Sequence, residues 1–105
     1  MNLSIRAALV AVALAVSATD ALAACREDLV ASAQTLERTR TGMQSAAGAA
    51  PAAQCAAYRQ HVASLKQART VFARCDTSAD KVKNDAQVGA TIAVVTKQAQ
   101  QACKK

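Results

Sequence analysis

The chain has 105 residues and a formal net charge of +6 at neutral pH, from 13 Lys and Arg against 7 Asp and Glu. Its apolar fraction is 52%, but much of this is alanine, and Tyr58 and Phe72 are the only aromatic residues. The periodic apolar sequence and the lack of a long run of like charge favour a folded over a disordered chain. The scarcity of aromatic rings argues against a surface that stacks nucleic-acid bases. We therefore expect a small folded protein whose thin core needs covalent support.

The N-terminal region has the parts of a secretory signal peptide. A basic residue precedes the unbroken apolar run Ala7–Val16, and Ala21 and Ala23 place small side chains at the two positions that a signal peptidase reads. The run is shorter than the roughly 20 residues that span a bilayer. The sequence predicts a signal peptide over residues 1–23, cleaved after Ala23, and a disulfide-stapled helical domain over residues 24–105.

A competing processing signal overlaps this site. Residues 22–25, Leu-Ala-Ala-Cys, resemble the lipobox of bacterial lipoproteins, in which the cysteine is lipidated and becomes the new N-terminus. Here the polar residues Ser17, Thr19 and Asp20 separate the apolar run from the motif. Lipidation of Cys25 would also leave an odd number of thiols in an oxidising compartment. We favour soluble export and keep a protein anchored through lipidated Cys25 as the alternative.

Apolar residues at helical spacing predict three helices, near 25–47, 52–75 and 78–103. The β-branched stretch Gly89–Val95 looks strand-like, but it lies inside a long helical pattern and has no partner strand. The stripes that define the helices are, in chain order, Cys25, Leu29, Ser32, Leu36, Thr39, Met43 and Ala46, then Cys55, Tyr58, Val62, Leu65, Phe72 and Cys75, then Val82, Val88, Ile92, Val95, Ala99 and Ala102.

The residues between these helices are typical of helix ends. Gly48 and Pro51 end the first helix, and Thr77 with Asp80 resembles a capping box that starts the third. Short connections between long helices favour antiparallel neighbours. The predicted fold class is all-α, a small antiparallel three-helix bundle (up-down-up) stapled by two disulfides.

This topology restricts how the four cysteines pair. Cys25 and Cys75 lie at one end of the bundle, and Cys55 and Cys103 lie at the other. A bridge from Cys55 to Cys75 would have to span about 20 residues of one helix, roughly 30 Å, whereas a disulfide needs about 4.4–6.8 Å between Cα atoms. Pairing Cys25 with Cys55, or Cys75 with Cys103, also joins opposite ends. The sequence therefore predicts the disulfides Cys25–Cys75 and Cys55–Cys103.

The sequence contains no pattern that indicates catalysis, a cofactor or a metal centre. It has no C-x-x-C motif and no glycine-rich phosphate loop, and the spacing of its acids does not match an EF-hand. The single histidine, His61, lies on the edge of the second stripe, where it is more often a hydrogen-bonded flanking residue than a general base. Small side chains in a three-helix bundle are also expected to leave little room for a pocket. We expect a protein that is not an enzyme.

The basic surface is the one sequence feature that suggests a binding function. Arg59, Lys66 and Arg69 follow spacings of seven and three, so they share one face of the second helix. A positive face attracts anionic lipids or cell-wall polymers, although it also serves simply to keep an exported protein soluble. Export argues against a nucleic-acid partner.

The sequence is compatible with two functions. The first is a periplasmic or secreted interaction module that binds a protein partner. The second is an envelope-surface protein, held by its basic charge or by lipidated Cys25. A membrane-active protein acting through the third helix is less favoured, because the apolar stripe of that helix is needed for the core. In composition alone, the combination of a signal peptide with an alanine-rich, four-cysteine helical domain resembles small bacterial envelope proteins and favours a Gram-negative periplasm.

Overall fold

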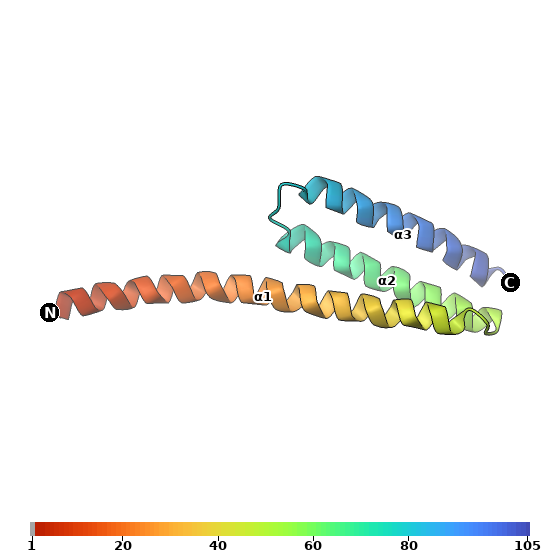
Figure 1. Ribbon diagram of the computed structural model, residues 1–105, viewed down its shortest axis with the longest axis horizontal. Coiled ribbons are helices and arrows are strands. Elements are labelled where there is room, and N and C mark those ends of the chain that lie inside the picture. The colour runs from red at the N-terminus through yellow and green to blue at the C-terminus, as the bar shows by residue number, and fades with distance from the viewer. Residues whose placement is uncertain (1) are drawn as a thin grey trace.

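The computed structural model describes the backbone of residues 2–105 and the side chains of residues 23–105. It contains three helices, α1 (Asn2–Ala46), α2 (Pro51–Cys75) and α3 (Lys81–Cys103), and no strand within the described backbone. The helices alternate in direction and pack against one another, so the predicted all-α, up-down-up bundle is confirmed (Figure 1).

The predicted signal peptide falls mainly in the part of α1 that lies beyond the end of α2 (Figure 1). The side chains of residues 1–22 are outside the described set, so the signal peptide and its cleavage after Ala23 stay predictions. Within the described side chains, α1 carries the expected first helix and ends at Ala46, one residue before the predicted end.

Both predicted disulfides are present. Cys25 and Cys75 are 5.5 Å apart at their Cα atoms, and Cys55 and Cys103 are 4.7 Å apart. The first bridge joins α1 to the end of α2, and the second joins the start of α2 to the end of α3. Together they leave no free cysteine among the described residues.

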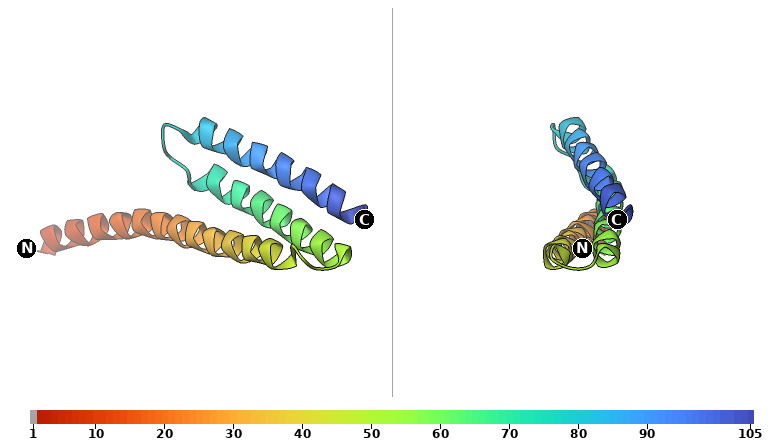
Figure 2. Two further views of the ribbon diagram at one scale, coloured as in Figure 1. Left: turned by 45° about the vertical axis from the view of Figure 1, so that its right-hand side comes forward. Right: turned by 90° about the vertical axis from the view of Figure 1, so that its right-hand side faces the viewer.

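The helix α2 is the central element of the bundle. It packs against α1 on one side and α3 on the other, while no Cα atom of α1 lies within 8 Å of a Cα atom of α3 among the described residues. The two views in Figure 2 show the same arrangement, with α1 and α3 on different sides of α2. The bundle is therefore open along the side where α1 and α3 would otherwise meet.

The turn between α1 and α2 is held by a side-chain amide. Pro51 occupies the first turn of α2, where its missing N–H costs no helical hydrogen bond. Gln54 Nε2 donates to the carbonyl oxygens of Ala47 at 3.1 Å and Ala49 at 3.0 Å. These carbonyls follow the end of α1 and have no helical partner, so one glutamine ties the start of α2 to the end of α1.

The start of α3 differs from the prediction. The helix begins at Lys81 and not near residue 78, and its N-cap residue, Asp80, makes no side-chain capping hydrogen bond. The expected capping box of Thr77 and Asp80 is not formed. Instead Asp76 Oδ1 accepts the Ser78 N–H at 2.9 Å, which makes a local Asp turn that holds the connection outside the helix.

The core is thin, as the composition predicts. The buried apolar side chains are Leu65, Ala68, Val95, Ala99 and Ala102, and three of these five are alanines. No large side chain among the described residues is fully buried. Alanine buries little apolar surface, so packing alone supplies a modest part of the stability, and the disulfides supply much of the rest.

Removing either disulfide is expected to destabilise the fold strongly. The bridges have sequence separations of 50 and 48 residues, and cross-links of that span stabilise by about 4 kcal/mol in the chain-entropy model. The double variants Cys25→Ser with Cys75→Ser, and Cys55→Ser with Cys103→Ser, should each lower the free energy of unfolding by about that amount. Chemical denaturation measures the loss, and hydrogen exchange should show faster opening of α1 in the first variant and of α3 in the second. Unchanged stability in both would contradict this account of the core.

Candidate functional site

An apolar groove lies along the open side of the bundle. It has a volume of about 690 Å³ and receives side chains from all three helices and the α2–α3 connection. We call this site the groove; its lining residues are Leu29, Leu36, Leu65, Ala68, Phe72, Cys75, Asp76, Thr77, Ser78, Asn84, Gln87, Val88 and Thr91. The expectation that small side chains would leave little room for a pocket is therefore wrong. The space arises because α1 and α3 flank α2 without closing over it.

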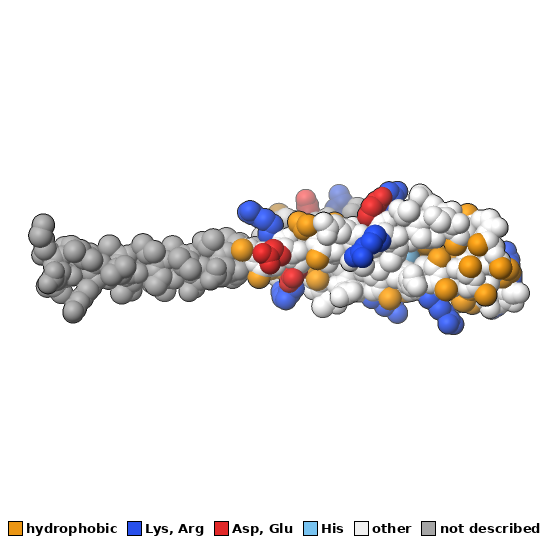
Figure 3. Space-filling model, turned by 90° about the horizontal axis from the view of Figure 1, so that it is seen from below, with side chains coloured by type: hydrophobic (Ala, Val, Ile, Leu, Met, Phe, Trp, Pro, Cys, Tyr) orange, Lys and Arg blue, Asp and Glu red, His pale blue; other side chains and the backbone are white. Residues whose placement is uncertain are grey.

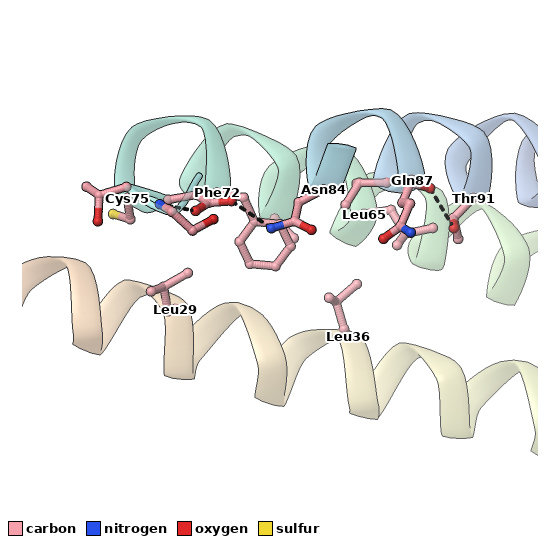
Figure 4. Close-up of a pocket in the computed structure, with 13 residues that line it drawn as sticks. Leu29, Leu36, Leu65, Phe72, Cys75, Asn84, Gln87 and Thr91 are labelled. Atoms are coloured by element: carbon pink, nitrogen blue, oxygen red, sulfur yellow. Dashed lines mark hydrogen bonds between the residues drawn. The ribbon is translucent and has the colours of Figure 1, made fainter. Parts of the chain in front are cut away.

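The floor and one wall of the groove are apolar. Leu29 and Leu36 point from α1 toward α2, and Leu65 and Phe72 lie opposite them (Figure 4). Each pair is seven residues apart, which is close to two helical turns and keeps both members on one side of their helix. Leu65 is only 7% exposed, whereas the other three are partly open to solvent.

The other wall is mixed, with three uncharged polar residues beside the apolar Val88. Asn84, Gln87 and Thr91 of α3 line it, and Thr91 Oγ1 donates to the Gln87 carbonyl at 3.0 Å (Figure 4). All three side chains belong to exposed residues. The amides of the asparagine and glutamine can donate and accept hydrogen bonds at the edge of the groove.

Asp76 closes one end of the groove. Its carboxylate accepts hydrogen bonds from the Ser78 backbone N–H and from Asn84 Nδ2, the latter at 3.1 Å. Hydrogen bonding to the Ser78 side chain, then to the Asn84 amide and then to the Ser78 backbone N–H, holds the pKa of Asp76 below its usual range. The carboxylate is thus ionised and fixes the connection against the first turns of α3.

His61 holds α1 to α2 near the middle of the contact between them. It is 7% exposed, and its Nδ1 lies 2.6 Å from Thr39 Oγ1. The Thr39 hydroxyl also donates to the Leu36 carbonyl at 3.2 Å, and in that arrangement Nδ1 carries the proton and donates to Thr39. Burial lowers the pKa of His61, and the positive charge of Arg40 lowers it further. A neutral, structural histidine fits this environment.

Acid should therefore weaken the fold through His61. The unfolded chain binds a proton on this residue near pH 6.5, whereas the folded chain resists it because the folded pKa is lower. The free energy of unfolding should be constant above that pH and fall as the pH drops below it. Denaturation curves at several pH values between about 7.5 and 5 measure this slope. The variant His61→Gln should lose the slope in that window, and an equal slope in both proteins would contradict the assignment.

The three predicted basic residues lie along the contact between α2 and α3. Arg59 lines a cleft of about 350 Å³ with Lys104, and Lys66 and Arg69 line another of about 500 Å³ with Asp85. The lining of these clefts shares no residue with the groove. We call the two clefts together the basic seam.

The charge of the basic seam is partly compensated. Arg69 donates through Nε and Nη2 to the two carboxylate oxygens of Asp85, at 2.9 and 3.0 Å. This pairing raises the pKa of Arg69 and lowers that of Asp85, with the hydrogen bond as the main cause in both. The guanidinium lies 3.1–3.3 Å from where a Cβ on Gly89 would be, so the glycine lets it rest against α3. Arg59 and Lys66 therefore keep more of the free positive charge than Arg69.

Two smaller clefts, of about 270 and 280 Å³, lie elsewhere among the residues with described side chains. Apolar side chains gather at the end where α1 turns into α2 (Figure 3), but the exposed residues of this turn are mostly alanines, which are too small to act as anchors. Among residues with described side chains, no group of three or more His, Cys, Asp or Glu is placed to hold a metal ion. No helix segment in that same part of the chain is long and apolar enough to cross a membrane.

The comparisons with known proteins assign no family. No family model matches the chain, and neither a curated protein nor a solved structure is significantly similar to it. Function therefore has to be argued from the groove and the basic seam.

The groove was not identified from the sequence. Its leucines and Phe72 belong to the stripes that predict the core, but in the structure Leu29, Leu36 and Phe72 are only half-buried. The sequence pattern that indicates the groove is a seven-residue spacing, between Leu29 and Leu36 and between Leu65 and Phe72. What the stripes do not show is that α1 and α3 fail to meet.

Proposed function

We propose that this protein is an exported, non-catalytic interaction module that works in the periplasm or outside the cell and binds a protein partner in the groove. Two disulfides support an oxidising compartment, because cytosolic thiols are kept reduced. The signal peptide predicted over residues 1–23 supports the same location.

The observation that carries this proposal is the open apolar groove on a covalently held scaffold. A volume of about 690 Å³ and a mostly apolar lining with a few polar groups are typical of clefts that bind ligands, which usually measure roughly 300–1,000 Å³. The disulfides fix both outer helices to α2, so the groove is preorganised and little ordering is lost when a partner binds.

A second candidate is an envelope-surface protein held by its positive charge. The basic seam favours it, since Arg59 and Lys104 share one cleft and Lys66 lies beside the next. Attachment of this kind would weaken at high ionic strength. The ion pair between Arg69 and Asp85 reduces the positive charge that the basic seam can offer to an anionic surface.

Lipidation of Cys25 is a less favoured way of holding the protein at the envelope surface. Acylation would use the sulfur that the structure places in the disulfide with Cys75. Soluble export keeps both bridges, and an anchored form would lose one of them.

The mature protein is expected to begin at Ala24 and to contain both disulfides. Intact mass spectrometry of the protein recovered after export, before and after reduction, measures the N-terminus and the oxidation state together. Acyl chains on Cys25 with a free Cys75 thiol would instead establish the anchored form. A protein that keeps residues 1–23 and stays reduced in the cytosol would overturn the proposed location.

Site-specific photo-crosslinking separates the two candidate functions. A photoreactive amino acid at Thr91 samples the groove, and the same residue at Thr70 samples the basic seam; both threonines are exposed. We expect one discrete protein adduct from position 91 in intact cells, and none from position 70. Adducts with lipid or cell-wall polymer from position 70 alone, lost at high salt, would favour the charge-held alternative.

A further inference from the structure

We propose that the occupant of the groove is a single amphipathic helix with an apolar heptad stripe and acidic flanks, which completes a four-helix bundle. This inference rests on the interaction function proposed above and specifies the chemistry of the partner. It follows from two independent properties of the site, its heptad geometry and its charge.

On each of the three helices that line the groove, a pair of lining residues is seven positions apart. Leu29 and Leu36 supply the α1 wall, Leu65 and Phe72 supply the floor, and Thr91 lies seven residues after Asn84 on the α3 wall. Seven residues of α-helix extend about 10.5 Å, so each pair spans the same length. A helix that packs among such rows must present apolar side chains at the same spacing, as in a four-helix bundle.

The α3 wall can contact such a helix beyond the end of the groove. Val94 lies seven residues after Gln87 and is 58% exposed, which extends the same face of α3 with an apolar side chain. The amides on this wall provide hydrogen bonds at the edge of the contact. An incoming helix would therefore bury apolar surface against α1 and α2 and meet a mixed surface on α3.

Basic residues lie beside the groove on both outer helices, while the one charged residue that lines it, Asp76, and the exposed Asp80, seven residues before Gln87, are acidic. Arg26 lies three residues before Leu29 and Arg40 lies four residues after Leu36, which places both on the row next to the leucines. On the opposite wall Lys83 lies one turn before Gln87. These residues are exposed, and neither Arg26 nor Lys83 forms an ion pair with another described residue. Charges in such flanking rows select the partner helix in bundles and coiled coils, so acidic flanks are complementary here.

Two charged residues change how an acidic helix would fit the groove. Arg40 is already paired with Glu37, at 2.7 Å, so it contributes less than Arg26 or Lys83. Asp76 closes one end of the groove, where the N-terminus of an incoming helix, the positive end of its dipole, is accommodated best. The net charge of +6 also disfavours a second copy of this chain as the occupant, because the basic flanks of the two copies would face each other.

The test uses the oxidised protein purified after export and two synthetic helical peptides. Both carry Leu at heptad positions; one has Glu and the other has Lys in the flanking rows. Fluorescence anisotropy at low and physiological salt measures their affinities. We expect the Glu-flanked peptide to bind roughly tenfold or more tightly than the Lys-flanked peptide, with the difference shrinking as salt rises.

Charge variants on the exposed wall test the location without disturbing the core. Gln87→Glu should weaken binding of the Glu-flanked peptide and Gln87→Lys should strengthen it, each by roughly threefold to tenfold. Gln100 is the matched control, because it is exposed on the same helix, lies about 140° around it at 3.6 residues per turn, and lines a different cleft. The variants Gln100→Glu and Gln100→Lys should leave the affinity for the Glu-flanked peptide unchanged. Leu36→Glu should abolish binding, with retained disulfides and helicity as the check on folding.

The outcomes separate this inference from the proposed function. Equal affinity for both peptides, or equal effects at Gln87 and Gln100, would overturn the acidic-helix assignment. A concentration-dependent dimer in analytical ultracentrifugation that displaces the peptide would make a second copy the occupant, and would also overturn it. If neither peptide binds while position 91 still crosslinks to a protein, the partner has other chemistry and the interaction function stands. If neither peptide binds and position 91 gives no protein crosslink, both the acidic-helix assignment and the proposed interaction function fail.

Discussion

The two disulfides determine how the rest of this structure is arranged. Each one connects an outer helix to α2, at opposite ends of that helix, and neither connects α1 to α3. The outer helices are therefore held in place whether or not they contact each other. A bundle stabilised by packing alone would gain by closing α1 onto α3 and burying the leucines between them. Here covalent bonds replace part of that packing, and the groove stays open.

The contacts on the two sides of α2 also differ in chemistry. Toward α1 they include the polar pair His61 and Thr39 and the exposed ion pair of Arg74 with Asp28. Toward α3 they include small apolar side chains such as Ala99 and Ala102. Small alanines let α3 approach α2, and the paired Arg69 and Asp85 add hydrogen bonds on that side as well. The buried histidine lies only on the α1 side, so a pH change in the range where histidine titrates affects mainly the attachment of α1.

The sequence was sufficient to predict the architecture and the cysteine pairing, and the reason is geometric. Helical stripes and short connections set the up-down-up order, and the length of α2 then forbids every pairing but one. It was not sufficient to predict the groove. Leu29, Leu36 and Phe72 belong to stripes that a closed bundle and an open one would share, and only the separation of α1 from α3 distinguishes the two. The Thr77 capping box failed for a local reason, since the Asp76 side chain captured the Ser78 N–H and kept residues 77–80 outside α3.

The placement of the cross-links has a consequence for resistance to proteolysis. The turn at residues 47–50 lies inside the loop closed by Cys25–Cys75, and the connection at residues 76–80 lies inside the loop closed by Cys55–Cys103. Proteases attack exposed connections of this kind first. A cut in either connection, or in both, leaves the three helices joined through sulfur, so the nicked molecule does not fall apart. A protein built this way tolerates cleavage at both connections between its helices while keeping the helices, and the surface they form, assembled.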